Sequence, residues 1–213
     1  MDRLPVIVRR HIAAFRALLV FTVLCGLVYP FVMVGVSQLA FNHQANGSPV
    51  SYNGKTVGSS LLCQEFTDAK GNPLPQYFQP RPSAAVNPAD KTDYGCDPGF
   101  SAASNLGPTN PALIQAIQQR QKQIAAFDHV PVSQIPPDAV TASGSGLDPD
   151  ISPQNAAIQV NRVAAARHLP VASVRNLVAK YTTGRVLGFL GEPVVNVLEL
   201  NIALDQLSAK SGS

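Results

Sequence analysis

Two aspartates near the middle of the chain are the first candidates for chemistry. Asp148 and Asp150 lie two residues apart, and paired carboxylates can hold a hard cation. Such sites usually need about six oxygen ligands or more, and Asp150 also precedes an expected helix start, where a negative charge is favourable in any case. The histidines show no ligand spacing, being scattered at His11, His43, His129 and His168. We therefore predict that the chain holds no metal.

The other reactive residue types give no nucleophile or phosphate site. Ser143 and Ser145 lie in a Gly-Ser loop, but Gly144-Ser145-Gly146 lacks the spacing of a nucleophile elbow. Gly54-Lys55-Thr56 ends like a phosphate-binding loop, yet Pro49 stands where that loop requires another glycine. We therefore expect no self-sufficient catalytic site, so the chain is not predicted to be an enzyme by itself.

The three cysteines fall in two different settings. Cys25 lies within a long apolar run and is interpreted as a small apolar residue. Cys63 and Cys96 share the remainder of the chain, and an oxidising compartment would permit a disulfide between them. Sequence spacing alone leaves open whether they are bonded.

These candidates are positioned by a chain that begins with a membrane-type segment. The residues from Ala17 to Val36 form a run of 20 without a charge, long enough as a helix to cross a hydrocarbon core of about 30 Å. We predict a transmembrane helix over 17–37. Pro30 removes a backbone donor and predicts a kink, and Gly26 opens a notch for a neighbouring helix.

Charge asymmetry predicts the orientation of that helix. The first 41 residues carry a net charge of +3 from four arginines and one aspartate, whereas the remainder has 12 basic and 12 acidic residues. The positive-inside rule then places 1–16 in the cytoplasm and the domain outside. A cleaved signal peptide is the competing interpretation, although the apolar run exceeds the roughly 7–15 residues of a signal core. The domain lacks clustered Lys and Arg, which argues against a nucleic-acid partner.

The rest of the chain predicts one loop-rich α+β domain over 42–207. Prolines and glycines break it into short elements, and Asn-Pro and Ser-Pro pairs favour helix starts. The expected elements are short strands with an Asn53-Gly54 turn in 50–66, a long ordered loop over 67–109, helices over 110–127, 152–168 and 171–183, and a strand over 194–200. The small, polar residues 208–213 are expected to be disordered.

Several blocks of residues, and their order along the chain, resemble one family, the KdpC subunits of the bacterial potassium-transporting Kdp ATPase. The resemblance covers about 12–207. It is carried by Tyr29-Pro30, Tyr77-Phe78, Arg81-Pro82-Ser83-Ala84-Ala85, Ser104-Asn105-Leu106-Gly107-Pro108-Thr109-Asn110-Pro111, 140–149, Ile151-Ser152-Pro153, Gln159-Val160, Arg162-Val163-Ala164, Leu187-Gly188-Phe189-Leu190-Gly191-Glu192-Pro193 and Asn196-Val197-Leu198. The chain departs from the family pattern at Cys63, Ala102-Ala103, Asp150 and Val194.

The resemblance implies a non-catalytic accessory subunit of an ATP-driven, high-affinity potassium uptake complex in the bacterial inner membrane. It implies three partners besides membrane lipid: a channel-like subunit on which the chain docks, a P-type ATPase subunit, and a small membrane subunit. The complex would use ATP, Mg and K+, with no cofactor bound directly by this chain.

The resemblance also suggests where contacts could lie. In the membrane we expect partner contacts at Gly26, Tyr29 and Pro30. In the domain, the loop residues expected to contact or brace a partner are Arg81, Ser83, Asn105, Thr109, Asn110, Ser143, Ser145 and Asp148.

A second role proposed for this family is that of a catalytic chaperone for ATP binding. It would fall here on Gln159, with Arg162 nearby. That role conflicts with the predicted topology, because a domain outside the membrane cannot contact cytoplasmic ATP. We therefore expect Gln159 and Arg162 to form a helix surface that hydrogen-bonds the Asn- and Ser-rich loops, with nucleotide-dependent regulation as the alternative. A free-standing extracytoplasmic hydrolase is the least favoured interpretation.

Overall fold

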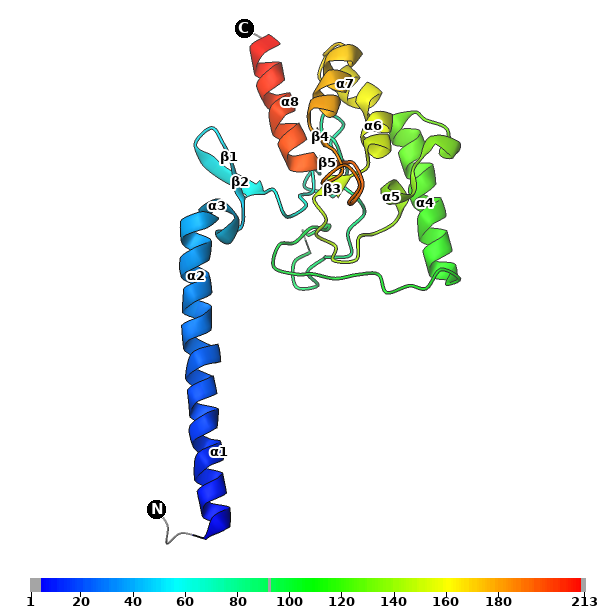
Figure 1. Ribbon diagram of the computed structural model, residues 1–213. Helices are drawn as coiled ribbons and strands as arrows, with labels where there is room; N and C mark the ends of the chain where they lie inside the picture. Colours follow the sequence, from blue (N-terminus) through cyan, green and yellow to red (C-terminus); the bar gives the residue numbers. More distant parts are fainter. Residues whose placement is uncertain (1–4, 92, 212–213) are drawn as a thin grey trace. The chain divides into compact units, whose positions relative to one another are not determined.

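The computed structural model describes residues 5–91 and 93–211. They divide into two compact units, the first ending at Ser48 and the second beginning at Pro49. The first unit is helical and the second mixes helices with short strands (Figure 1). The predicted architecture, one apolar N-terminal helix followed by a mixed domain, is confirmed.

The N-terminal unit is one long helix followed by a short one. The elements α1 (Val6–Val23), η1 (Leu24–Val28) and α2 (Tyr29–Ala40) form a continuous helix of 35 residues, long and apolar enough to cross a membrane, and α3 (Asn42–Ala45) follows it. The helix therefore extends beyond the predicted 17–37.

Pro30 affects the helix through the turn before it. Because Pro30 has no N–H, the carbonyl one turn earlier loses its usual partner, and the π-helical turn η1 ends two residues before the proline. The predicted kink itself stays a prediction.

The domain opens with the predicted hairpin. The strands β1 (Pro49–Tyr52) and β2 (Lys55–Ser59) pair antiparallel, and the two residues between them have φ angles of 51° at Asn53 and 77° at Gly54. Positive φ at both positions is what a tight two-residue hairpin turn requires. Lys55 and Thr56 are thus strand residues rather than part of a phosphate loop. The strand ends at Ser59, short of the predicted 66.

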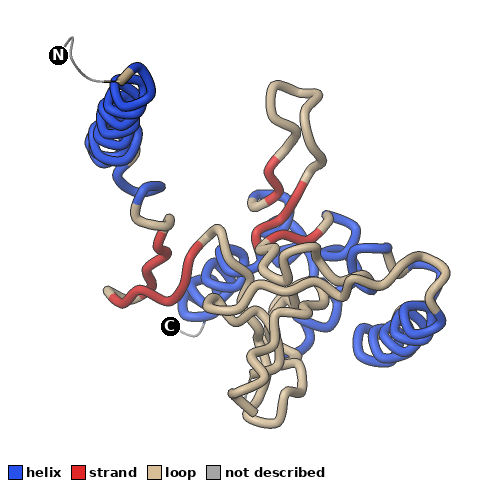
Figure 2. Tube along the Cα trace, turned by 90° about the horizontal axis from the view of Figure 1, so that it is seen from below, coloured by secondary structure: helices blue, strands red, loops and turns tan. Residues whose placement is uncertain are grey.

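A long loop separates β2 from α4, as predicted. Among its described residues there is no helix or strand, only an isolated bridge between Thr67 and Pro73. Figure 2 shows how much of the domain is loop. Phe78 anchors this loop, because its side chain is fully buried in the hydrophobic core.

Three predicted helices are present with their predicted starts. The side chain of Asn110 caps α4 (Pro111–Asp128), and Ser152 caps α6 (Pro153–Ala166). The third helix, α7 (Val171–Lys180), ends before the predicted 183, because β4 (Thr182–Thr183) follows it. Two short turns, η2 (Val132–Gln134) and α5 (Pro137–Val140), connect α4 to the next strand, β3 (Asp150–Ile151).

The predicted strand over 194–200 is wrong after its third residue. Here β5 (Val194–Asn196) is the central strand of a small antiparallel sheet ordered β3-β5-β4, and α8 (Val197–Ser211) begins directly after it. The side chain of Asn196 accepts a hydrogen bond from the Glu199 N–H, as a helix cap does. Val197, Leu200 and Leu204 then face the core at helical spacing.

The expectation of a disordered tail also needs correction. The helix α8 continues to Ser211, and the Ser208 hydroxyl accepts a hydrogen bond from Arg167 at 3.1 Å. Residues 212 and 213 lie outside the described part of the chain. The core itself lies where α6, α7 and α8 pack together over the small sheet (Figure 1).

Candidate functional site

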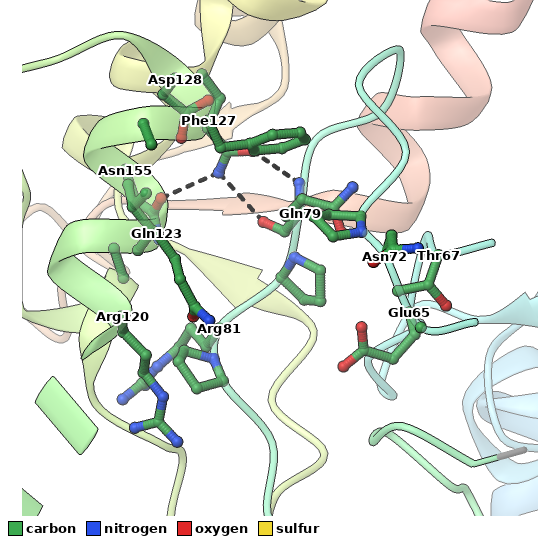
Figure 3. Close-up of a pocket in the computed structure, with 18 residues that line it drawn as sticks. Glu65, Thr67, Asn72, Gln79, Arg81, Arg120, Gln123, Phe127, Asp128 and Asn155 are labelled. Carbon is green, nitrogen blue, oxygen red and sulfur yellow. Dashed lines mark hydrogen bonds between the residues drawn. The ribbon is translucent and has the colours of Figure 1, made fainter. Parts of the chain in front are cut away.

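A cleft with a volume of about 680 Å³ lies between α4, the start of α6 and the early part of the long loop. Its apolar wall includes Pro80, Pro82, Ile124 and Phe127. Polar and charged side chains project between these residues (Figure 3). The cleft contains Gln159, the residue on which the nucleotide hypothesis rests.

Gln159 has its hydrogen-bonding capacity filled from within the domain. Its Oε1 accepts from the Gln79 backbone N–H at 2.7 Å and from Arg162 Nη2 at 2.8 Å. Its Nε2 donates to the Gln79 carbonyl at 3.2 Å and to Asn155 Oδ1 at 3.0 Å. A primary amide offers two donors and two acceptor sites, so no group is left for a ligand. Only 3% of the residue is exposed.

Arg162 clamps the same loop from a neighbouring turn of α6. Its Nη1 donates to the carbonyls of Pro75 and Tyr77 at 2.7 and 2.9 Å, and its Nε donates to Asp128 Oδ1 at 2.7 Å. The guanidinium also lies 4.3 Å from the centre of the Phe127 ring. The expected helix surface is therefore wrong: Gln159 and Arg162 are interior residues, and they bind the loop at 75–79 rather than the Asn- and Ser-rich loops.

The Arg162–Asp128 pair is buried on both sides, with each side chain 5% exposed. Burial raises the pKa of Asp128 and lowers the pKa of Arg162, and the attraction between the two opposes both shifts. The short contact and the carbonyls around Arg162 favour the ionised pair, because they stabilise the cation where water cannot.

Two more arginines meet at the lower end of the cleft (Figure 3). Arg81 pairs with Asp148 at 2.7 Å and donates to the Thr141 carbonyl at 3.5 Å, while Arg120 donates to the preceding carbonyl, Val140, at 2.9 Å. Burial lowers the pKa of Arg120. Among the described residues, the buried Arg81 Nε has no hydrogen-bond partner.

Sequence reasoning selected Arg81 and Asp148 but missed Arg120 and Glu65. Arg120 follows Ile117 by three residues and precedes Ile124 by four, so the helical apolar pattern could have placed it on the inward side of α4. Glu65 carries no such signal. Burial, with a smaller contribution from nearby Asp93, raises its pKa to about 7.

A second cluster gathers Ser83 and Ser145 around the disulfide. Cys63 and Cys96 are bonded, with their Cα atoms 5.4 Å apart. Ser83 Oγ donates to the Gly146 carbonyl at 2.7 Å and accepts from the Cys96 N–H at 3.0 Å.

Gly146 closes this cluster. A Cβ at this position would lie 2.6 Å from the Ala102 carbonyl oxygen, and its φ is +72°. Both observations restrict the position to glycine. Ser145 accepts from the Ala102 N–H at 3.0 Å through its carbonyl, so the cluster joins three stretches of the long loops.

The remaining predicted positions are spread over the surface and the span. Asn105 and Thr109 are exposed on the long loop, and Asn110 caps α4. The Ser143 backbone N–H donates to the Pro82 carbonyl, and among the described residues its buried hydroxyl has no partner. In the apolar helix, no other side chain crowds Gly26, which lies within η1, and Tyr29 with Pro30 opens α2.

The aspartates considered for metal binding have other contacts. Asp148 pairs with Arg81, and Asp150 accepts from Asn196 at 3.3 Å. Burial, followed by the proximity of Asp148, raises the pKa of Asp150. Within the described residues, no group of three or more His, Cys, Asp or Glu side chains could hold a metal ion.

Within the described residues, the chain combines one helix that is long and apolar enough to cross a membrane with a disulfide-linked α+β domain. Comparison with known proteins names the family. The family model described as "K+-transporting ATPase, c chain" (KdpC) matches residues 11–206. The chain therefore belongs to the KdpC family.

Curated relatives agree over nearly their whole length, and each is named "Potassium-transporting ATPase KdpC subunit". The relative from Sorangium cellulosum is 52% identical over 188 residues, covering 88% of this chain and 93% of the relative. The one from Acidobacterium capsulatum is 50% identical over 185 residues, or 87% and 91% of the two chains. The one from Mycobacterium tuberculosis is 46% identical over 200 residues, or 93% and 99%.

Proposed function

We propose that this chain is a non-catalytic accessory and assembly subunit of a bacterial potassium-uptake ATPase. The observation that carries the proposal is the match to the KdpC family over residues 11–206, which includes both the span and the domain. The span anchors the chain in the inner membrane with its N-terminus in the cytoplasm, and the domain docks outside on the channel-like subunit. The pump subunit and the small membrane subunit complete the complex, which supplies ATP hydrolysis and carries K+.

The internal polar network supports an assembly role. Gln159 and Arg162 use their hydrogen bonds to hold the loop around Gln79 against α6, so they fix the shape of the domain. The exposed loop that carries Asn105 and Thr109 is thereby presented on a rigid support. A preorganised surface loses less conformational entropy on binding a partner.

The nucleotide-regulator alternative, in which Gln159 contacts ATP, receives less support. A contact through Gln159 would have to replace hydrogen bonds to Gln79, Asn155 and Arg162 that are all made within the domain. Breaking such a buried set costs several kcal/mol, on the order of 1–3 for each group left unpaired.

The anchor provides the experiment that tests assembly. Gly26 has no atom of a neighbouring side chain within 4 Å of a built Cβ, so Gly26→Leu would fill the notch while leaving the span apolar. We expect Gly26→Leu to reduce co-purification of the other subunits with the full chain by about tenfold.

The matched control is Gly35→Leu, because Gly35 is the second glycine of the span and is equally uncrowded. It tests whether added bulk anywhere in the helix is enough to weaken assembly. Full recovery of the complex with Gly26→Leu would overturn the proposed helix–helix contact.

A further inference from the structure

The loop between β4 and β5 carries the most exposed apolar cluster of the described part of the domain. We call residues 185–192 the apolar hairpin. It projects from its two strands (Figure 2), and all six residues from 186 to 191 are apolar or glycine. The large side chains are mostly exposed: Val186 65%, Leu187 79%, Phe189 67% and Leu190 48%.

The apolar hairpin is an ordered structure. Val186 and Leu190 exchange both backbone hydrogen bonds at 2.9 Å, and at its neck Arg185 pairs with Glu192 at 2.7 Å. Leu187 is held at a φ of +54°, a conformation that costs energy for a residue with a branched side chain. The fold therefore holds these side chains outward in one defined arrangement.

The backbone of the hairpin tip is largely self-sufficient. Besides the Val186–Leu190 pair, the Gly188 N–H donates to the Arg185 carbonyl at 3.1 Å, and the Phe189 N–H donates to the Val186 carbonyl at 3.3 Å. Hydrocarbon offers no hydrogen-bond partners, so a segment that enters it must satisfy its own donors. The two charges lie at the neck and neutralise each other, where a polar headgroup region can also solvate them.

We propose that the apolar hairpin inserts into the membrane surface as a second attachment point. A bilayer is the favoured occupant because the same chain carries a span from Val6 to Ala40, which keeps lipid at a high effective concentration around the domain. Four large side chains give an apolar contact area without any charge at the tip. The inference depends on the anchor but not on the predicted orientation, because either leaflet offers the same hydrocarbon.

The absence of tryptophan from the chain allows a direct test. The variant Phe189→Trp places a single reporter at a position that is 67% exposed, where the larger ring can be accommodated. The full chain is reconstituted into phosphatidylcholine vesicles with and without brominated acyl chains, and Trp fluorescence is recorded. We expect blue-shifted emission and at least twofold quenching by the brominated lipid.

Two single-Trp variants calibrate the measurement. Phe31→Trp lies within the span and is expected to be quenched strongly, whereas Ile114→Trp lies on α4, is 45% exposed, and is expected to stay unquenched. Leu190→Trp serves as a second reporter in the hairpin if Phe189→Trp fails to fold.

Solvent-like, unquenched emission from the hairpin beside a quenched Phe31→Trp would overturn the proposal. Repeating the measurement in the assembled complex shows whether the hairpin is covered by lipid or by a partner subunit. A blue shift that appears only with the complex and resists brominated lipid would also overturn insertion and assign the hairpin to a protein pocket. The Gly26→Leu experiment measures subunit assembly, so its outcome does not change what Trp quenching in vesicles says about insertion of the hairpin.

Discussion

At the scale of single residues, Gln159 shows how burial changes the meaning of a polar side chain. Its amide lies in the wall of the cleft but bonds to the backbone of Gln79 on both sides. The side chain thus substitutes for a strand partner and orders a loop that has no helix or strand of its own. This structural requirement accounts for a glutamine at this position without a ligand.

Replacing Gln159 is therefore expected to affect stability first. We predict that Gln159→Ala destabilises the domain by about 2–4 kcal/mol, because it removes a buried side chain and leaves the half-buried Gln79 N–H and carbonyl unpaired. Thermal unfolding of the full chain in detergent, followed by circular dichroism, measures the change. Gln123→Ala is the matched control, since Gln123 lines the same cleft but is exposed, and its effect should stay within about 0.5 kcal/mol.

Glu65 predicts a pH dependence. Its pKa is raised from 4.5 to about 7 by burial and by Asp93, so between these values the folded chain holds a proton that the unfolded chain has released. The contribution of Glu65 to stability is therefore present below pH 4.5 and is lost as the pH rises through 7. Glu65→Gln should then stabilise the domain by on the order of 1–2 kcal/mol at pH 8 and have little effect at pH 5.

The measurement for Glu65 is the unfolding temperature of both proteins across this pH range. Parallel pH profiles for the wild type and Glu65→Gln would contradict the assignment.

At the scale of elements, the long loop is stabilised by cross-links instead of regular structure. The disulfide joins residues 33 apart in sequence, and the Ser83 hydroxyl connects the Cys96 backbone to Gly146. These cross-links hold the parts of the loop around Cys63, Ser83 and Cys96 together. The expected partner-binding residues Asn105 and Thr109 follow the cross-linked part, so their presentation depends on it.

Reducing the disulfide is expected to destabilise the domain by about 3–4 kcal/mol, from the chain entropy of a loop of 33 residues. For a chain of this size that corresponds to a fall of about 10 °C in the unfolding temperature. The test compares unfolding with and without reductant. Cys25→Ala serves as the control and should leave the unfolding temperature unchanged, because Cys25 is a free, exposed cysteine in the span. An unchanged temperature after complete reduction, verified by alkylation and mass, would refute a stabilising role.

At the scale of the whole molecule, the two units differ in where their apolar side chains lie. The N-terminal helix buries none of its apolar side chains within the protein, whereas the domain has its own core centred on α6, α7 and α8. A helix of this composition needs lipid or another protein around it. Four arginines precede the apolar run and predict that this end of the helix stays in the cytoplasm.

That topology can be tested with thiol chemistry on intact spheroplasts. In a Cys25→Ala background with the disulfide left intact, Thr109→Cys places a thiol at an exposed position of the long loop, and we expect a membrane-impermeant maleimide to label it without lysis. The variant Val8→Cys, in which Cys63 and Cys96 are also replaced by serine, marks the opposite end of the helix and should be labelled only after lysis. The reverse pattern would place the domain in the cytoplasm and restore the possibility of nucleotide contact.

The sequence by itself determined the features that depend on local patterns. An uncharged run of 20 residues specifies a span because its length matches the bilayer, and Asn110-Pro111, Ser152-Pro153 and Asn53-Gly54 specify two helix starts and a turn through backbone chemistry. Only the tertiary structure decided what depends on contacts between distant segments. Gln159 meets Gln79 across 80 positions, Arg81 meets Asp148 across 67, and Val197 begins a helix because its apolar neighbours face a core built by other elements. No local pattern encodes such pairings, since they arise from how the whole chain encloses its core.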